Sequence, residues 1–198
     1  MFKFVYYIFR LIFLPFLKWF LPLFSTKASL RIKFENKNID DSACSSFKEI
    51  NKQADYAFEI SSEGELQQVK PIILKVLSEG LLVEIIYCSD SVDKQCQSLF
   101  RSYPNTLRIL RLPILSFNPF SKLNPMKWLT AKSFFLCRYD FFPELIFYGR
   151  KKSVMFNLLA GTLKNIGHKG KNLLFRNYLS YVYHSFDKLI MATDKDKE

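Results

Sequence analysis

The stretch YAFEISSEGELQQVKPIILKVLSEGLLVEIIYCSD, residues 56–90, determines the fold class of this protein. Its opening residues, 56–60, form a short apolar run that predicts a strand. Leucine, isoleucine and valine then recur at helical spacing over 65–78, and residues 81–87 are rich in β-branched side chains, which favour a second strand. A strand, a helix and a strand in this order predict a parallel pair joined by a crossover helix.

The same alternation continues towards the carboxyl terminus. We expect further strands over 107–112, 133–138 and 154–159, and helices over about 92–101, 143–148 and 173–179. Repeated in this way, the pattern predicts an α/β fold with a doubly wound parallel sheet and right-handed crossovers. Ligands of such sheets bind at the carboxyl ends of the strands, so the loops after Ile60, Cys88, Leu112 and Arg138 are the candidate binding loops.

Residues 1–24 read MFKFVYYIFRLIFLPFLKWFLPLF and are apolar apart from Lys3, Arg10 and Lys18. On a helical wheel these cations share one narrow stripe, so we expect a membrane-associated helix that lies in the interface with its cations among the headgroups. A tilted spanning helix is the alternative. A signal peptide fits poorly, because Arg10 and Lys18 interrupt the apolar run. Basic residues follow the helix and favour the cytoplasmic side of the membrane.

We interpret residues 25–54 as a connector and residues 55–198 as one α/β domain. The chain carries a formal net charge of +11, and its second half holds the excess, with 14 basic residues against two acidic ones between 101 and 186. A concentrated charge of this kind indicates a polyanionic partner. We expect membrane lipid and no nucleic acid, because an RNA-binding strand signature is missing. The four cysteines and two histidines lack metal-ligand spacing, so we predict no metal site and no disulfide framework.

The loop after the first expected strand reads ISSEGE, residues 60–65. Ser62 and Glu65 fit a capping box, in which both side chains satisfy backbone N–H groups at a helix start. They also fit a functional reading, in which Glu65 presents a carboxylate at the end of the sheet and Gly64 lets a substrate approach the backbone. Both interpretations stay open at this point.

This loop resembles the S-x-G-E motif of the 3-deoxy-D-manno-octulosonic acid (Kdo) transferases of lipopolysaccharide assembly, with Ser62, Gly64 and Glu65 matching. The similarity continues through Gln68 and Pro71 into YCSDSVDKQCQSLF, residues 87–100. It extends to RYDFFPEL, residues 138–145, and to SFDKLIMATDKDKE at 185–198. Within RYDFFPEL, Asp140 and Pro143 match, whereas Phe142 replaces a tryptophan and Arg138 replaces an acid.

The resemblance implies a Rossmann-like fold, the amino-terminal half of a GT-B glycosyltransferase, in which Glu65 is the catalytic base. It would deprotonate an acceptor sugar hydroxyl for attack on CMP-Kdo, with no metal and no other cofactor. The acceptor would be a phosphorylated lipid A precursor at the cytoplasmic face of the inner membrane. The residues expected to bind this acceptor are Ser62, Gly64, Asp140, Arg150, Lys151 and Lys152. Further expected headgroup contacts are Lys164, Lys169, Lys171 and Arg176.

Members of this family hold CMP-Kdo mainly in a second, carboxyl-terminal domain. We expect that donor domain to be absent from this chain, which would make the protein a truncated or split Kdo transferase whose partner is a separate donor-binding domain. The alternative is a non-catalytic membrane-bound protein that binds anionic lipid through its basic second half.

Overall fold

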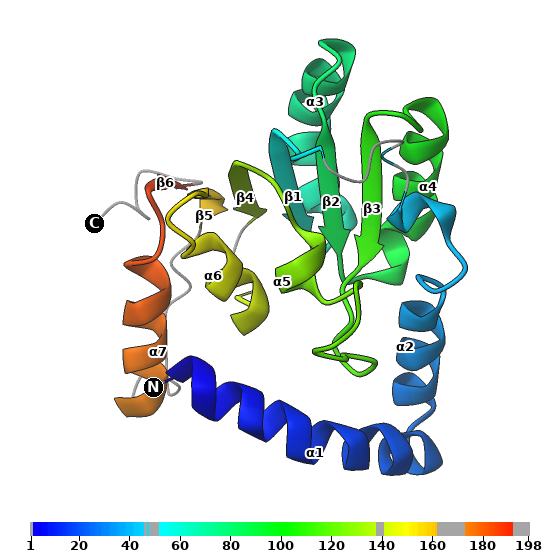
Figure 1. The fold of residues 1–198 in the computed structure, drawn as a ribbon, viewed down its shortest axis with the longest axis vertical. Helices are drawn as coiled ribbons and strands as arrows, with labels where there is room; N and C mark the ends of the chain where they lie inside the picture. Colours follow the sequence, from blue (N-terminus) through cyan, green and yellow to red (C-terminus); the bar gives the residue numbers. More distant parts are fainter. Residues whose placement is uncertain (1, 46, 48–51, 138–140, 162–172, 192–198) are drawn as a thin grey trace.

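The structure is a computed structural model that describes residues 2–45, 47, 52–137, 141–161 and 173–191 (Figure 1). Within these residues the chain forms a six-stranded parallel sheet with the strand order β3-β2-β1-β4-β5-β6. The strands are β1 (Tyr56–Ile60), β2 (Val83–Tyr87), β3 (Leu107–Arg111), β4 (Ser133–Cys137), β5 (Met155–Gly161) and β6 (Lys188–Met191). This order confirms the expected doubly wound α/β sheet and puts its topological switch point between β1 and β4.

Helices cover both faces of the sheet. On one face lie α3 (Glu63–Ser78) and α4 (Asp93–Ser102), and on the other lie α5 (Pro125–Trp128), α6 (Pro143–Gly149) and α7 (Leu173–Tyr183). Each face has its own buried apolar cluster, because neighbouring residues of a strand point to opposite sides. Phe58 and Ile85 belong to the α3 and α4 side. Phe134 and Phe156 stack on the α6 side with ring centroids 5.2 Å apart.

The ends of α3 follow from local sequence signals. The helix begins at Glu63 because Ser62 is its N-cap, and it ends before Gly80, whose φ of 76° lies in the left-handed region that favours glycine. The helix expected from 65 onwards therefore begins two residues earlier. Short 3₁₀ turns, η1 (Ser42–Cys44) and η2 (Asp90–Val92), complete the segments that border β3 and α4.

Two helices precede the sheet. The apolar helix α1 (Phe2–Phe24) runs along the edge of the sheet where the strands end, and α2 (Thr26–Asn36) turns from it towards β3 (Figure 1). The structure thus differs from the interpretation of residues 25–54 as a connector, because α2 is helical and Phe34, Ala43 and Cys44 are buried with the domain. The apolar residues of α2 have little helical periodicity, and contacts with distant segments supply the missing stabilisation.

Among the described residues, one helix, over Tyr6–Phe24, is long and apolar enough to cross a membrane by length and composition. Most of its large side chains remain exposed in the folded chain, among them Phe16, Trp19, Phe20, Leu23 and Phe24. Leu14 is buried against the domain. The helix therefore has one face that packs on protein and a broad apolar face that does not.

Candidate functional site

The S-x-G-E motif lies at the switch point of the sheet. Ser62 follows the end of β1, and Gly64 and Glu65 lie in the first turn of α3. Strand β4, which ends at Cys137, is the neighbour of β1 on the other side of the switch point. Asp140 lies outside the described residues. The crevice at a switch point is where doubly wound sheets bind their ligands.

Glu65 forms the capping box that its spacing with Ser62 predicts. The Glu65 backbone N–H donates to Ser62 Oγ at 3.4 Å, and Glu65 Oε2 accepts from the N–H groups of Ser61 and Ser62 at 2.6 and 3.2 Å. The residue is only 5% exposed. Backbone N–H groups and the helix dipole thus surround the carboxylate with positive potential. The same contacts fix its position at the switch point.

A second acid lies next to this capping box. Glu59 is fully buried on β1, and Ser61 Oγ donates to its Oε1. The Cys88 thiol, at the end of β2, is 3.2 Å from Ser61 Oγ. Sequence reasoning missed Glu59, although an acid within the apolar run YAFEI was the available signal. The switch point therefore carries two carboxylates on adjacent segments, with a serine hydroxyl bound to one of them.

Helix α2 covers the ends of the next two strands. Arg31 donates to the carbonyl oxygens of Cys88 and Leu112, the latter at 2.7 Å. Glu35 accepts from the N–H groups of Leu115 and Ser116, with its Oε2 at 3.0 and 2.6 Å. The loops after Cys88 and Leu112, which are also candidate binding loops, are therefore partly covered, because α2 occupies polar groups where β2 and β3 end. The neighbourhood of the S-x-G-E motif remains as the candidate site.

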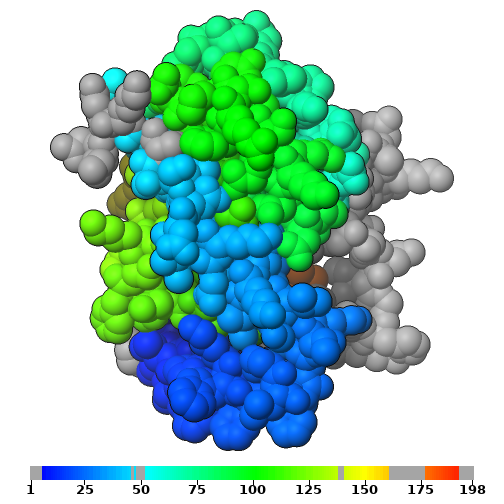
Figure 2. Space-filling model, turned by 90° about the vertical axis from the view of Figure 1, so that its right-hand side faces the viewer, coloured from blue at the N-terminus to red at the C-terminus, as the bar shows by residue number. Residues whose placement is uncertain are grey.

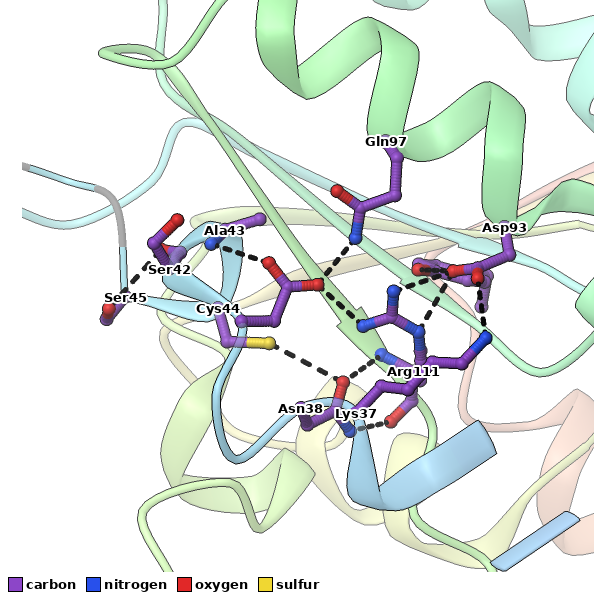
Figure 3. A network of polar contacts seen from close by, with 11 residues as sticks. Lys37, Asn38, Ser42, Ala43, Cys44, Ser45, Asp93, Gln97 and Arg111 are labelled. Carbon is purple, nitrogen blue, oxygen red and sulfur yellow. Dashed lines mark hydrogen bonds and ion pairs between the residues drawn. The ribbon is translucent and has the colours of Figure 1, made fainter. Parts of the chain in front are cut away.

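A buried polar network holds the segment after α2 in place (Figure 3). Arg111, at the end of β3, donates to Asp41 Oδ2 at 2.7 Å and to Asp93 Oδ1 at 2.9 Å. The Asn38 side chain bonds both backbone groups of Arg111, as an adjacent strand would. Burial by itself raises the pKa of Asp41, but hydrogen bonds from Arg111, Ala43 and Gln97 outweigh it, so the pKa lies below its usual value.

The apolar helix is attached to the same edge of the sheet. Arg10 forms an ion pair with Glu144 at 2.6 Å and donates to the Ile114 carbonyl oxygen at 2.6 Å. The Tyr6 hydroxyl donates to Glu144 at 2.7 Å. Ile114 follows β3 and Glu144 lies in the first turn of α6, which follows β4, so both partners lie where strands end. The expectation that Arg10 lies among headgroups is wrong, because a buried carboxylate binds it instead.

The basic run at 150–152 lies at the opposite edge. Met155 is level with Ser133 and, through it, with Tyr56, so residues just before β5 are where the strands begin. About five residues of strand, roughly 16 Å, separate this edge from Ser62. Arg150 donates to Ser185 Oγ at 2.9 Å, Lys151 donates to the Met126 carbonyl oxygen at 3.1 Å, and Lys152 is exposed. The structure therefore does not bring these acceptor-binding candidates together with Glu65.

The positions of the remaining expected headgroup contacts are not described. Lys164, Lys169 and Lys171 lie outside the described residues, and the side chain of Arg176 does too.

In the part of the chain that the structure describes, no group of three or more histidine, cysteine or acidic side chains could hold a metal ion. The cysteines there are free thiols, and burial raises the pKa of Cys44 and of Cys96 to about 12.

Comparison with known proteins adds no family assignment. No protein-family model matches the chain, and no curated protein matches it in sequence. The class that fold and site define is therefore an α/β protein with a doubly wound parallel sheet, an acid-bearing switch point and an apolar helix docked beside it.

Proposed function

We propose that this protein is the acceptor-side part of a Kdo transferase that works at a membrane surface. One observation carries the proposal: the S-x-G-E motif and the docked apolar helix share one edge of the sheet. A lipid acceptor in the bilayer would reach the switch point from that edge. Glu65 would accept the proton of the attacking sugar hydroxyl, and its fixed position suits a general base.

The acceptor would be a phosphorylated lipid A precursor and the donor CMP-Kdo, as the resemblance implies. The membrane would be the inner membrane, with the domain on its cytoplasmic face. Asp140 would contribute to the acceptor site, as the resemblance implies, and Gly64 leaves open space above the first turn of α3. The proposal assigns no acceptor contact to Arg150, Lys151 and Lys152, because they lie at the far edge of the sheet.

The test is a transfer assay with the full chain on lipid vesicles that contain the lipid A precursor, with CMP-Kdo as donor. Mass spectrometry of the lipid fraction detects the added sugar. The assay is run with the chain alone and with a separately supplied donor-binding domain of the family. Transfer in either case that Glu65→Gln reduces at least 100-fold supports the proposal. Absence of product in both cases contradicts the proposal, provided that circular dichroism shows both proteins to be folded.

A second candidate is a non-catalytic membrane protein that binds anionic lipid. The observation that favours it is the use of Glu65 Oε2 by two backbone N–H groups, which is the whole role of a structural cap. Under this function Glu65→Gln leaves vesicle binding unchanged, whereas reversing the charges of Arg150, Lys151 and Lys152 removes it. If charge reversal at 150–152 has no effect on binding, the basic second half is not the lipid-binding surface.

A further inference from the structure

A groove of about 320 Å³ separates α1 from residues 115–120. Leu14, Pro15, Lys18 and Trp19 line it from the helix. Figure 2 shows α1 in dark blue at the base of the molecule, with the yellow-green stretch around residue 125 resting above it. The volume lies in the range of small-ligand sites, which is about 300–1,000 Å³. Neither the switch point nor the basic run at 150–152 contributes to this groove.

Lysine side chains lie in and near the wall of the groove. Neither α1 nor residues 112–137 contain an acidic side chain, whereas Lys18 lies in the wall and Lys127 donates to the carbonyl oxygen of Phe120 at 3.3 Å. Arg10 also reaches the groove, but Glu144 already balances its charge. Glu35 accepts from the N–H groups of Leu115 and Ser116 in the groove wall, and Arg31 balances that carboxylate. Among the described residues, Lys18 forms no ion pair. A ligand with one negative charge would therefore find an uncompensated lysine.

The rims of the groove are aromatic and exposed. Trp19 is 80% exposed on the helix side, and Phe120 is 82% exposed on the other side. Phe16 and Phe20 continue the apolar surface along α1. Large aromatic side chains beside a lysine are typical of the membrane interface, where rings reach the acyl boundary and cations meet headgroups. A soluble anion would gain nothing from these rings, so the rims favour a lipid.

We propose that this groove binds an anionic glycerophospholipid, whose phosphate pairs with Lys18 while its acyl chains pass between Trp19 and Phe120. In this arrangement α1 lies in the plane of the membrane, with its Arg10 face on the domain and its exposed face among lipids. The proposal rests on the membrane association within the proposed function and not on Kdo transfer. The two fail separately, because lipid binding is measured here without donor or acceptor sugar.

Trp19 supplies the readout, because it is exposed whereas Trp128 is buried. The full chain is titrated with monomeric dihexanoyl phosphatidylglycerol, with dihexanoyl phosphatidylcholine and with glycerol 3-phosphate. We expect a saturable blue shift of tryptophan emission with phosphatidylglycerol alone, and loss of that shift in Trp19→Phe. An equal response to phosphatidylcholine would overturn the proposed role of the negative charge. An equal response to glycerol 3-phosphate would overturn the proposal that the ligand is a lipid.

Substitutions locate the site. Lys18→Gln should weaken phosphatidylglycerol binding about five-fold, which is the expected contribution of one lysine to binding at an anionic membrane surface. Phe120→Ala should weaken it as well, through loss of an apolar rim. Matched controls are Lys94→Gln on α4 and Lys152→Gln at the far edge of the sheet, both exposed lysines, and neither should change the affinity. An unchanged affinity in Lys18→Gln, or a loss in Lys152→Gln equal to it, contradicts the proposal.

Discussion

Arg10 of α1 and Glu144 of α6 form an ion pair whose side chains are 11% and 4% exposed. Tyr6 donates to the same carboxylate oxygen, and Tyr7 and Phe147 pack next to it with ring centroids 6.1 Å apart. Arg10, which belongs to the polar stripe of this apolar helix, therefore faces protein instead of lipid headgroups. A helix held in this way along the sheet edge cannot cross a bilayer without breaking a buried ion pair, which supports the in-plane arrangement within the proposed membrane association.

Arg10→Leu should lower the free energy of unfolding by about 3–5 kcal/mol, because it leaves the Glu144 carboxylate buried without its counter-ion. Urea unfolding followed by circular dichroism measures the change. The double variant Arg10→Leu, Glu144→Leu should recover most of the loss, since apolar side chains replace both charges. Lys75→Ala is the control, because its ion pair with Glu79 is exposed and screened by solvent, so its loss should change stability far less. Equal effects of the two single variants would contradict the structural role of Arg10.

The sheet could be predicted from sequence, whereas the attachment of the amino-terminal segment could not. Strand β1 and helix α3 are each signalled within a few residues, by an apolar run and by a capping box. Arg10 and Glu144 are 134 positions apart, and Arg31 binds a carbonyl oxygen 81 positions away. No local pattern reports such contacts. An isolated cation in an apolar segment fits a headgroup contact or a buried pair equally well.

The same limit applies to the candidate site. The S-x-x-E spacing was sufficient to predict the contacts of Ser62 and Glu65, because they lie within one helical turn. The distance between Glu65 and Lys152 was not predictable from the sequence, because it depends on the edge of the sheet at which β5 begins. The resemblance to the Kdo transferases led us to expect Glu65 and Lys152 in one acceptor site. The parallel register instead places them at opposite edges of the sheet.

Two substitutions in the capping box separate stability from catalysis. Ser62→Ala removes the N-cap acceptor of α3 and should cost about 1 kcal/mol of stability while Kdo transfer persists. Glu65→Gln keeps an oxygen that accepts the Ser61 and Ser62 N–H groups, so it should change stability by less than about 1 kcal/mol. It should nevertheless reduce transfer at least 100-fold. Thermal unfolding and the transfer assay, run on both variants, give the comparison. Loss of transfer in Ser62→Ala at full stability would show that the hydroxyl itself takes part.

Substitution of two glycines by alanine should change the stability in opposite directions. A Cβ on Gly149 would overlap the ring of Phe156, which is fully buried between neighbours, so Gly149→Ala should destabilise the domain by about 1–3 kcal/mol. A Cβ on Gly64 meets nothing within 4 Å, so Gly64→Ala should keep or raise stability by up to about 1 kcal/mol. Urea unfolding measures both. If an acceptor approaches the backbone of α3, Gly64→Ala should still raise its KM in the transfer assay.

The pair Gly149→Ala, Phe156→Leu provides the control for the first glycine. A smaller side chain at 156 leaves room for the added methyl group, so the double variant should be less destabilised than the sum of the single variants. Simple additivity would mean that the Phe156 ring is not what limits the space at Gly149.

The contacts of Asp41 predict how stability changes in acid. Its pKa in the folded chain lies below the ordinary value of 3.8, through hydrogen bonds from Arg111, Ala43 and Gln97 that outweigh burial. Folding therefore favours the carboxylate, so this stabilisation is fully present above pH 3.8 and disappears as pH falls through the lowered pKa. Asp41→Asn should cost about 1–3 kcal/mol at pH 7, and its difference from the unmodified chain should shrink below about pH 4. Urea unfolding across this pH range measures the difference, with exposed Asp40→Asn as the neighbouring control. A difference that stays constant down to pH 2 would show that Asp41 acts through its shape and hydrogen bonding alone, because only a charged carboxylate loses its advantage on protonation.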